Sequence, residues 1–164
     1  MRELKGLFIE DEVANIDIYT KLFALEGLHL ECINELPSTL EGFYDIVLKR
    51  DVDFLISDYY LDKQVTYKGI DVLREIRKYD STIYAVLLTN YQLKDFADQF
   101  GDYDYELQKD TIVERYVDVA EKIKRACDLR KENMIYKGIV HQEEEESDTI
   151  KLLKEINSKL DSKE

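Results

Sequence analysis

The stretch FLISDYYLDKQVTYKG, residues 54–69, begins as a short apolar run and then reaches an acidic residue, Asp58, before a long polar loop. The apolar run, DFLIS at 53–57, is too short for an ordinary helix and has the length of a buried strand. Taken alone, an acid that follows a strand is most often a turn or cap residue. The role of Asp58 therefore depends on which other side chains meet it.

Strands and helices alternate on both sides of this stretch. Further short apolar or alternating runs predict strands, and these are LKGLFI (4–9), LHLECI (28–33), TIYAVLL (82–88) and the weaker YDYELQ (103–108). Segments with the spacing of amphipathic helices lie between them, at 13–26, 38–49, 69–79 and 91–99. Ser38 is a candidate helix N-cap, and Glu41 completes the capping-box spacing. We therefore expect an α/β fold, with a doubly wound five-stranded parallel sheet of order 2-1-3-4-5, flavodoxin-like, and helices on both faces.

The helical pattern that follows the last predicted strand is longer than a covering helix needs. We expect one domain over 1–126 and a helical extension over 127–164, with an acidic linker at 142–148 and a short amphipathic helix at 149–160. That last helix either docks on its own domain or binds a partner or a second copy of the chain. The pattern leaves both alternatives open.

Composition narrows the class of partner. The chain has 164 residues, 45% of them hydrophobic, and a formal net charge of -13, which disfavours binding to nucleic acid or to anionic membrane surfaces. Its two cysteines, Cys32 and Cys127, have no disulfide, zinc or redox spacing. No signal peptide or membrane-spanning run is visible, so we expect a soluble cytoplasmic protein.

Acidic residues follow two strands that this sheet order makes neighbours. Glu10, Asp11 and Glu12 come after the first strand, and Asp58 comes after the third. Ligands of open parallel sheets bind beyond the carboxyl ends of the strands, where the strand order reverses. Two carboxylates about 4 Å apart repel by roughly 4 kcal/mol at an effective dielectric near 20, so the cluster either raises a pKa or binds a cation. Oxygen ligands without the EF-hand spacing favour Mg²⁺.

Two more reactive residues follow the remaining strands. Thr89 comes after YAVLL and can donate a hydroxyl hydrogen bond, and Lys109 comes after YELQ and can bring an ammonium group to an anion. A phosphoryl group on Asp58 would meet both groups and the metal. In this interpretation Asp58 is a nucleophile that forms an aspartyl phosphate.

Five strand-end motifs in this order give the chain a family resemblance. LFIEDE, FLISDYYL, GIDVLREIR, VLLTN and ELQK together resemble the receiver domain of two-component response regulators, the CheY-like superfamily, over residues 4 to about 126. The resemblance implies that Asp58 is the phosphoacceptor and a Mg²⁺ ligand. It implies that Asp11 binds the metal directly, Glu10 mostly through water, and Tyr60 through its backbone carbonyl. It also implies that Thr89 and Lys109 contact the phosphoryl group.

The chain departs from the family pattern at several positions. Asp110 stands where a proline usually follows the lysine, so we expect a trans bond after Lys109. The loop from Asp58 to Gly69 is longer than usual, and Asn90 replaces a small residue. The position that holds an aromatic switch residue in the family falls on Glu106, although Tyr105 would take it if the strand carries a bulge.

We predict a stand-alone response regulator. It would accept a phosphoryl group from a histidine kinase or histidine phosphotransfer protein and signal to a downstream protein through its fourth and fifth helices. Its only enzymatic activity would be Mg²⁺-dependent self-phosphorylation and dephosphorylation. A homodimer through those two helices or through the C-terminal helix is left open. The alternative is a degenerate receiver that acts as an interaction or dimerisation module without phosphorylation.

Two other metal-dependent classes fit less well. A haloacid dehalogenase-like phosphohydrolase needs an acid two residues after its nucleophile, where this chain has Tyr60. A Toprim nuclease needs an Asp-x-Asp pair at a strand end, whereas Asp102 and Asp104 precede a predicted strand.

Overall fold

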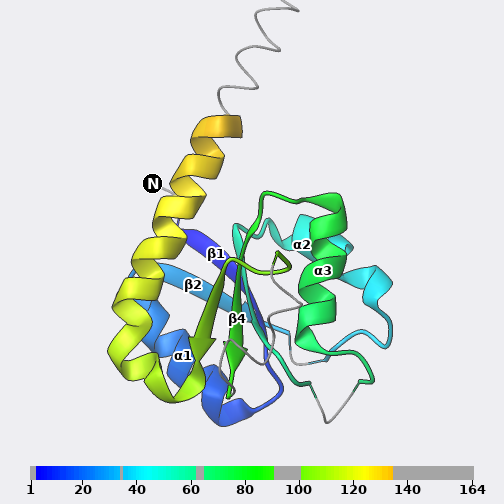
Figure 1. Ribbon diagram of the computed structural model, residues 1–164, viewed down its shortest axis with the longest axis horizontal. Coiled ribbons are helices and arrows are strands. Elements are labelled where there is room, and N and C mark those ends of the chain that lie inside the picture. The colour runs from blue at the N-terminus through cyan, green and yellow to red at the C-terminus, as the bar shows by residue number, and fades with distance from the viewer. Residues whose placement is uncertain (1–2, 34, 62–64, 91–100, 135–164) are drawn as a thin grey trace, which may run out of the picture. The chain divides into compact units, whose positions relative to one another are not determined.

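The computed structural model describes residues 3–33, 35–61, 65–90 and 101–134. Its elements in chain order are β1 (Leu4–Ile9), α1 (Val13–Leu25), β2 (Leu28–Cys32), the 3-10 turn η1 (Leu40–Gly42), α2 (Phe43–Arg50), β3 (Phe54–Asp58), α3 (Gly69–Tyr79), β4 (Tyr84–Thr89), β5 (Tyr105–Gln108) and the 3-10 turn η3 (Lys109–Thr111) (Figure 1). Residues 112–134 are helical. The chain groups into two compact units, Met1–Cys127 and Asp128–Glu164, and the features below belong to the first. The predicted segments 91–99, 142–148 and 149–160 lie outside the described residues.

The five strands form one sheet in the order β2-β1-β3-β4-β5, and every neighbouring pair is parallel. The predicted fold class and strand order are therefore confirmed. Two strands end one residue later than expected, because Asp58 and Thr89 are the last residues of β3 and β4. Parallel pairing brings the carboxyl ends of β1, β3, β4 and β5 to one edge of the sheet, which is where the candidate residues lie.

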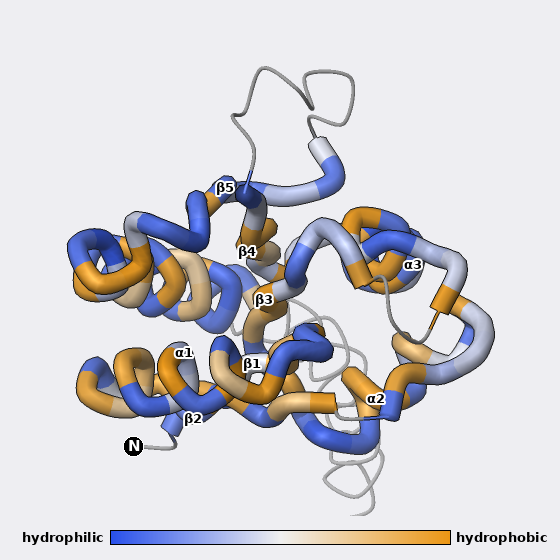
Figure 2. The backbone as a smooth tube through the Cα atoms, turned by 90° about the horizontal axis from the view of Figure 1, so that it is seen from below, coloured by the Kyte–Doolittle hydropathy of each residue, from blue (hydrophilic) through white to orange (hydrophobic). Residues whose placement is uncertain are grey.

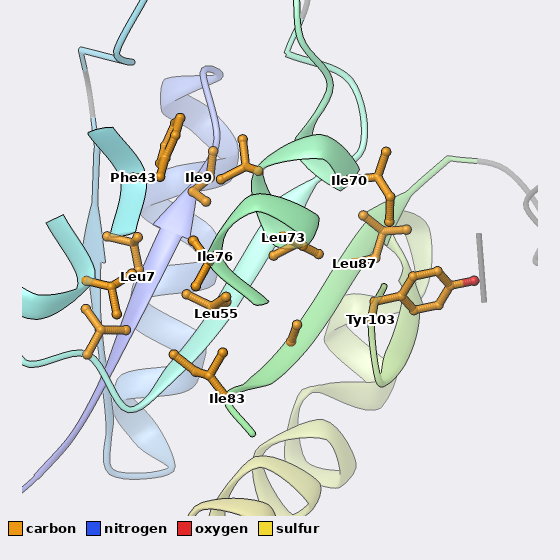
Figure 3. Packing of buried hydrophobic residues seen from close by; sticks show 14 of the residues in the cluster. Leu7, Ile9, Phe43, Leu55, Ile70, Leu73, Ile76, Ile83, Leu87 and Tyr103 are labelled. Carbon is orange, nitrogen blue, oxygen red and sulfur yellow. The ribbon is translucent and has the colours of Figure 1, made fainter. Parts of the chain in front are cut away.

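Both faces of the sheet are buried, and alternate residues of each strand point to opposite faces. On β3, Phe54 and Ile56 pack with α1 and with helical residues 112–127, whereas Leu55 packs with α2 and α3. Figure 2 shows α1 on one side of the sheet and α2 and α3 on the other. Figure 3 shows the core between the sheet and α2 and α3, in which Leu73 and Ile76 of α3 lie over Leu55. The strands consequently read as continuous apolar runs, as expected of a sheet covered on both faces.

The predicted capping box at Ser38 was wrong. The chain first makes the 3-10 turn η1, and α2 begins at Phe43 with Gly42 in the N-cap position and no side-chain cap. Two tertiary features accompany this later start. Phe43 is fully buried, and the Tyr67 hydroxyl donates to the carbonyl of Pro37 at 2.5 Å. Local capping propensity was therefore overridden by packing. By contrast, α3 covers the predicted 69–79, where the apolar spacing is strongest.

No helix among the described residues is long and apolar enough to cross a membrane. Neither cysteine is in a disulfide: Cys32 is half-buried, and Cys127 is buried.

Candidate functional site

Asp58 is held by the backbone at the end of β3. All five residues of β3 are buried, and Asp58 itself is only 7% exposed. The amide of Tyr59 donates to the carbonyl of Leu88 at 2.9 Å, which extends the pairing with β4 beyond the strand. The Ser57 hydroxyl donates to the carbonyl of Asp58 at 3.0 Å. These contacts fix the direction in which the Asp58 carboxylate leaves the sheet.

Gly69, the first residue of α3, lies against the backbone of Asp58. A Cβ atom at this position would lie 1.6 Å from the Asp58 carbonyl oxygen and 2.4 Å from Ser57 Oγ. The Gly69 amide also donates to the carbonyl of Tyr59 at 2.8 Å. Only glycine permits this approach, so Gly69 is a structural requirement of the site that the apolar pattern of the sequence does not indicate.

Three carboxylates meet at this edge of the sheet. One carboxylate oxygen each from Glu10, Asp11 and Asp58 lies within 4.8 Å of the others. Glu10 is fully buried; its Oε1 accepts from the amides of Asp11 and Glu12 at 3.1 and 3.2 Å. Its Oε2 has no hydrogen-bond partner among the described residues. Glu12 lies apart from this cluster, since its carboxylate accepts a hydrogen bond from Asn15 at 3.0 Å.

Lys109 reaches the cluster from the end of β5. Its Nζ donates to Asp58 Oδ2 at 2.8 Å and lies 3.5 Å from Glu10 Oε2. The Lys109 side chain is only 14% exposed. The structure thus brings together one nearly buried cation and two nearly buried carboxylates from three different strand ends, as the sequence predicted.

Burial controls the ionisation of these groups. Burial, followed by the charge of Asp58, raises the pKa of Glu10 to about 7. Burial also raises the pKa of Asp58, although the hydrogen bond from Lys109 opposes this shift. For Lys109, burial alone would lower the pKa, but the hydrogen bond and charge of Asp58 outweigh it and raise the pKa. The cluster is therefore short of positive charge.

The donor set of this cluster fits a hard divalent cation. All three ligand groups are carboxylates, two of them nearly buried, and one oxygen of Glu10 has no hydrogen-bond partner among the described residues. Oxygen-only ligation with few carboxylates is typical of Mg²⁺, which keeps several waters. The residues present are therefore compatible with the expected metal. The carbonyl of Tyr60 as a further ligand stays a prediction.

Thr89 lies at the same edge of the sheet but is bound to a different residue. Its Oγ1 donates to Glu106 Oε1 at 2.8 Å, and Thr89 is almost completely buried. The register of β4 and β5 is continuous, with Leu87 opposite Glu106 and Thr89 opposite Gln108. Glu106 therefore occupies the position that faces Thr89, and the alternative of a bulge that would bring Tyr105 there was wrong. Sequence reasoning identified the position of Glu106 but not its hydrogen bond.

Aromatic side chains cover the start of the loop after Asp58. The rings of Tyr59 and Tyr60 meet edge to face with centroids 4.7 Å apart, and Lys68 Nζ lies 5.5 and 5.6 Å from the two ring centres. Cation–π contacts of this kind stabilise the loop at its two ends. Residues 62–64 of the loop lie outside the described residues.

Two remaining predictions concern the backbone and the Asp-x-Asp pair. No cis peptide bond occurs in the described part of the chain, so the bond after Lys109 is trans as predicted. Asp102 pairs with Arg74 at 2.8 Å, and Asp104 pairs with Arg77. These pairs join α3 to the segment just before β5, so Asp102 and Asp104 are explained as structural residues.

Comparison with known proteins identifies the fold. No protein-family model and no curated protein sequence matches the chain. It is similar to the structure of a response regulator receiver domain protein from Clostridium thermocellum, with 23% identity, a TM-score of 0.61, and coverage of 78% of this chain and 97% of that one. It is also similar to the response regulator protein TrrA from Thermotoga maritima in complex with Mg²⁺-BeF, with 19% identity, a TM-score of 0.59, and coverage of 75% and 98%.

A third similar structure belongs to a longer protein. NtrX from Brucella abortus in complex with ATP has 18% identity and a TM-score of 0.66, and the match covers 81% of this chain but 29% of NtrX. Across these structures the shared feature is the five-stranded receiver fold. The chain therefore has the fold of response regulator receiver domains.

Proposed function

We propose that this chain is a phosphoacceptor receiver domain in which Asp58 accepts a phosphoryl group. The observation that carries the proposal is the contact of the Asp58 carboxylate with Lys109 at 2.8 Å, inside a cluster that also contains Glu10 and Asp11. Phosphoryl transfer requires positioning and charge neutralisation more than covalent chemistry by the protein. The fixed Asp58 carboxylate would provide the positioning. The nearly buried Lys109, together with a cation held by the acid pair, would provide the charge neutralisation.

The donor in this proposal is a phosphohistidine of a histidine kinase or histidine phosphotransfer protein. A carboxylate oxygen of Asp58 attacks phosphorus; a P–O bond forms, the P–N bond breaks, and its electron pair leaves with the imidazole nitrogen. Lys109 then neutralises part of the added negative charge, and the hydroxyl of Thr89 donates to a phosphoryl oxygen. Hydrolysis of the acyl phosphate returns Asp58 and inorganic phosphate.

Asp11 and Asp58 would hold Mg²⁺ directly, with Glu10 acting through water and Tyr60 through its carbonyl. The bound ion would supply further charge neutralisation for the phosphoryl oxygens. In the same proposal, output goes through contact with a downstream protein. The net charge of -13 argues against direct contact with nucleic acid.

The alternative, a receiver that works without phosphorylation, draws on one observation. The hydroxyl of Thr89 already donates to Glu106 and is not directed at a phosphoryl group. Whether Asp58 accepts phosphate at all therefore decides between the two functions.

The test is incubation with acetyl phosphate and Mg²⁺, followed by intact-mass measurement. We expect the wild type to gain one phosphoryl group, and Asp58→Asn or a sample with EDTA to gain none. Asp51→Asn is a matched control, because Asp51 is exposed and has a left-handed backbone that asparagine tolerates. A wild type that stays unmodified, or an Asp58→Asn variant that gains as much as the wild type, would refute the proposal. Transfer from a phosphorylated histidine phosphotransfer domain then tests the class of donor.

A further inference from the structure

Glu106 binds a hydroxyl group that the proposed chemistry needs. A threonine hydroxyl has one proton to donate, and in this structure Thr89 donates it to Glu106 Oε1 at 2.8 Å. The same proton cannot serve a phosphoryl oxygen on Asp58 at the same time. The resting contact and the phosphorylated state therefore compete for one donor.

The acceptor in this contact is a carboxylate, which strengthens the competition. Hydrogen bonds to ionised acceptors are stronger than those to neutral ones. Thr89 is almost completely buried, so water does not easily replace the partner it would lose.

We propose that Glu106 is a positioning residue that opposes phosphoryl acceptance, by holding the Thr89 hydroxyl until the phosphoryl group displaces it. This inference rests on the proposed phosphorylation of Asp58. It assigns a specific restraint to this chain: a hydrogen bond must break between β4 and β5 before Thr89 can contact the phosphoryl group.

The surroundings of Glu106 provide space for its release. Glu106 lines a cavity of about 450 Å³ along β5, together with Tyr103, Gln108, Thr111 and Arg115. Arg115 contacts the hydroxyl of Tyr105 and lies 3.4 Å from Asp118. A released carboxylate would therefore stay in a partly open space that has a cation on its wall. Release therefore breaks the hydrogen bond to Thr89 but leaves the carboxylate in a partly open cavity.

The test measures the initial rate of phosphoryl uptake from acetyl phosphate with saturating Mg²⁺. We expect Glu106→Ala to accelerate uptake about tenfold, the size expected for loss of one hydrogen bond to a charged acceptor. Glu106→Gln keeps an acceptor for Thr89 but removes the charge, so we expect a smaller acceleration. Glu106→Gln also provides the test if the Glu106→Ala variant folds poorly. Glu114→Gln removes an exposed acid near the start of the last described helix and should leave the rate unchanged.

The Thr89→Ala background separates a restraint on Thr89 from a simple charge effect. Without the Thr89 hydroxyl, Glu106 can no longer hold that donor, so we expect Glu106→Gln to change the rate less than about twofold there. An equal acceleration in both backgrounds would reduce Glu106 to a remote charge and overturn the inference. Unchanged or slower uptake by both Glu106 variants would overturn it as well.

A measurement on the unphosphorylated chain keeps the two proposals distinguishable. The Thr89 methyl resonance should shift as the Glu106 carboxyl titrates, and this shift should disappear in Glu106→Gln. If the shift is seen but neither the wild type nor any variant accepts phosphate, the proposed function is wrong and the restraint falls with it. If phosphate is accepted but the shift is absent, the proposed function stands and the restraint alone is wrong.

Discussion

The acid side of the site and its hydroxyl side satisfy their polar groups in different ways. At the ends of β1 and β3, the carboxylates of Glu10 and Asp58 are buried near each other, and Glu10 Oε2 has no hydrogen-bond partner among the described residues. At the ends of β4 and β5, Thr89 and Glu106 form a hydrogen bond of 2.8 Å. Binding a proton or a cation stabilises crowded like charges, whereas breaking a satisfied hydrogen bond is destabilising. The acid side therefore favours a ligand, and the hydroxyl side resists change.

The largest expected effect is on the backbone that supports the acid side. In Gly69→Ala, the new Cβ atom would overlap the carbonyl oxygen of Asp58, so α3 or the end of β3 must move. We expect the free energy of unfolding to fall by more than about 3 kcal/mol, as for other strained or overpacked buried positions. Urea denaturation measures this loss.

Gly42→Ala is the matched control for that experiment. Gly42 has an ordinary right-handed backbone, and its nearest neighbour for a Cβ atom is Pro37 at 3.9 Å. We expect a change within about 0.5 kcal/mol. A Gly69→Ala variant as stable as this control would show that the contact between α3 and Asp58 is not tight.

The second prediction removes the charge of Glu10. Its raised pKa means that the folded chain binds this proton more tightly than the unfolded chain. Glu10 therefore makes the metal-free fold less stable as pH rises from about 4.5 to about 7, by roughly 1.4 kcal/mol per pH unit. In Glu10→Gln we expect this part of the slope to vanish, and the free energy of unfolding at pH 8 in EDTA to rise by on the order of 2 kcal/mol.

Chemical denaturation at several pH values, with and without Mg²⁺, measures this effect. The raised pKa of Asp58 contributes a slope of the same sign, and because Glu10 and Asp58 interact, the difference between the two proteins measures the contribution of the acid pair. Mg²⁺ should stabilise the wild type more than the variant. Glu12→Gln is the control, since the exposed Glu12 lies outside the acid cluster. A destabilised Glu10→Gln at pH 8 would mean that the carboxylate is satisfied in the metal-free fold, and the contrast between the two sides would be lost.

The third prediction makes the complementary change on the hydroxyl side. Thr89→Val keeps the shape of the side chain but removes the donor to Glu106. We expect a loss of about 1 kcal/mol in the free energy of unfolding, opposite in sign to the effect of Glu10→Gln. Thr82→Val is the control, because Thr82 is exposed and its hydroxyl bond to Asp80 is open to water. A Thr89→Val variant that is more stable than the wild type would show that both sides are strained.

The acid side could be predicted from the sequence because each of its residues sits at a strand end. Apolar runs place β1 and β3, alternation of strands and helices makes the sheet parallel, and the carboxyl ends then coincide. Glu10, Asp11, Asp58 and Lys109 follow from that geometry without knowledge of any side-chain conformation. The structure brings them together as expected.

The hydroxyl side depended on features that the sequence does not encode locally. Whether Glu106 or Tyr105 faces Thr89 is set by the register of β5, because a shift of one residue exchanges the two faces of a strand. Gly69 was placed correctly at the start of α3, but its contact with Asp58 depends on how the helix docks. Likewise, the start of α2 followed the burial of Phe43 and not the capping signal at Ser38.

The smallest expected effect tests the register on which the comparison depends. Tyr105 lies on the opposite face of β5 from Glu106, where its hydroxyl contacts Arg115 and its ring lies near Lys122. Tyr105→Phe keeps the ring and removes only an exposed hydroxyl, so we expect less than about 0.5 kcal/mol of destabilisation and no change in the rate of phosphoryl uptake. An uptake rate that responds to Tyr105→Phe but not to Glu106→Gln would place the tyrosine beside Thr89, and the hydroxyl side would then lose its carboxylate restraint.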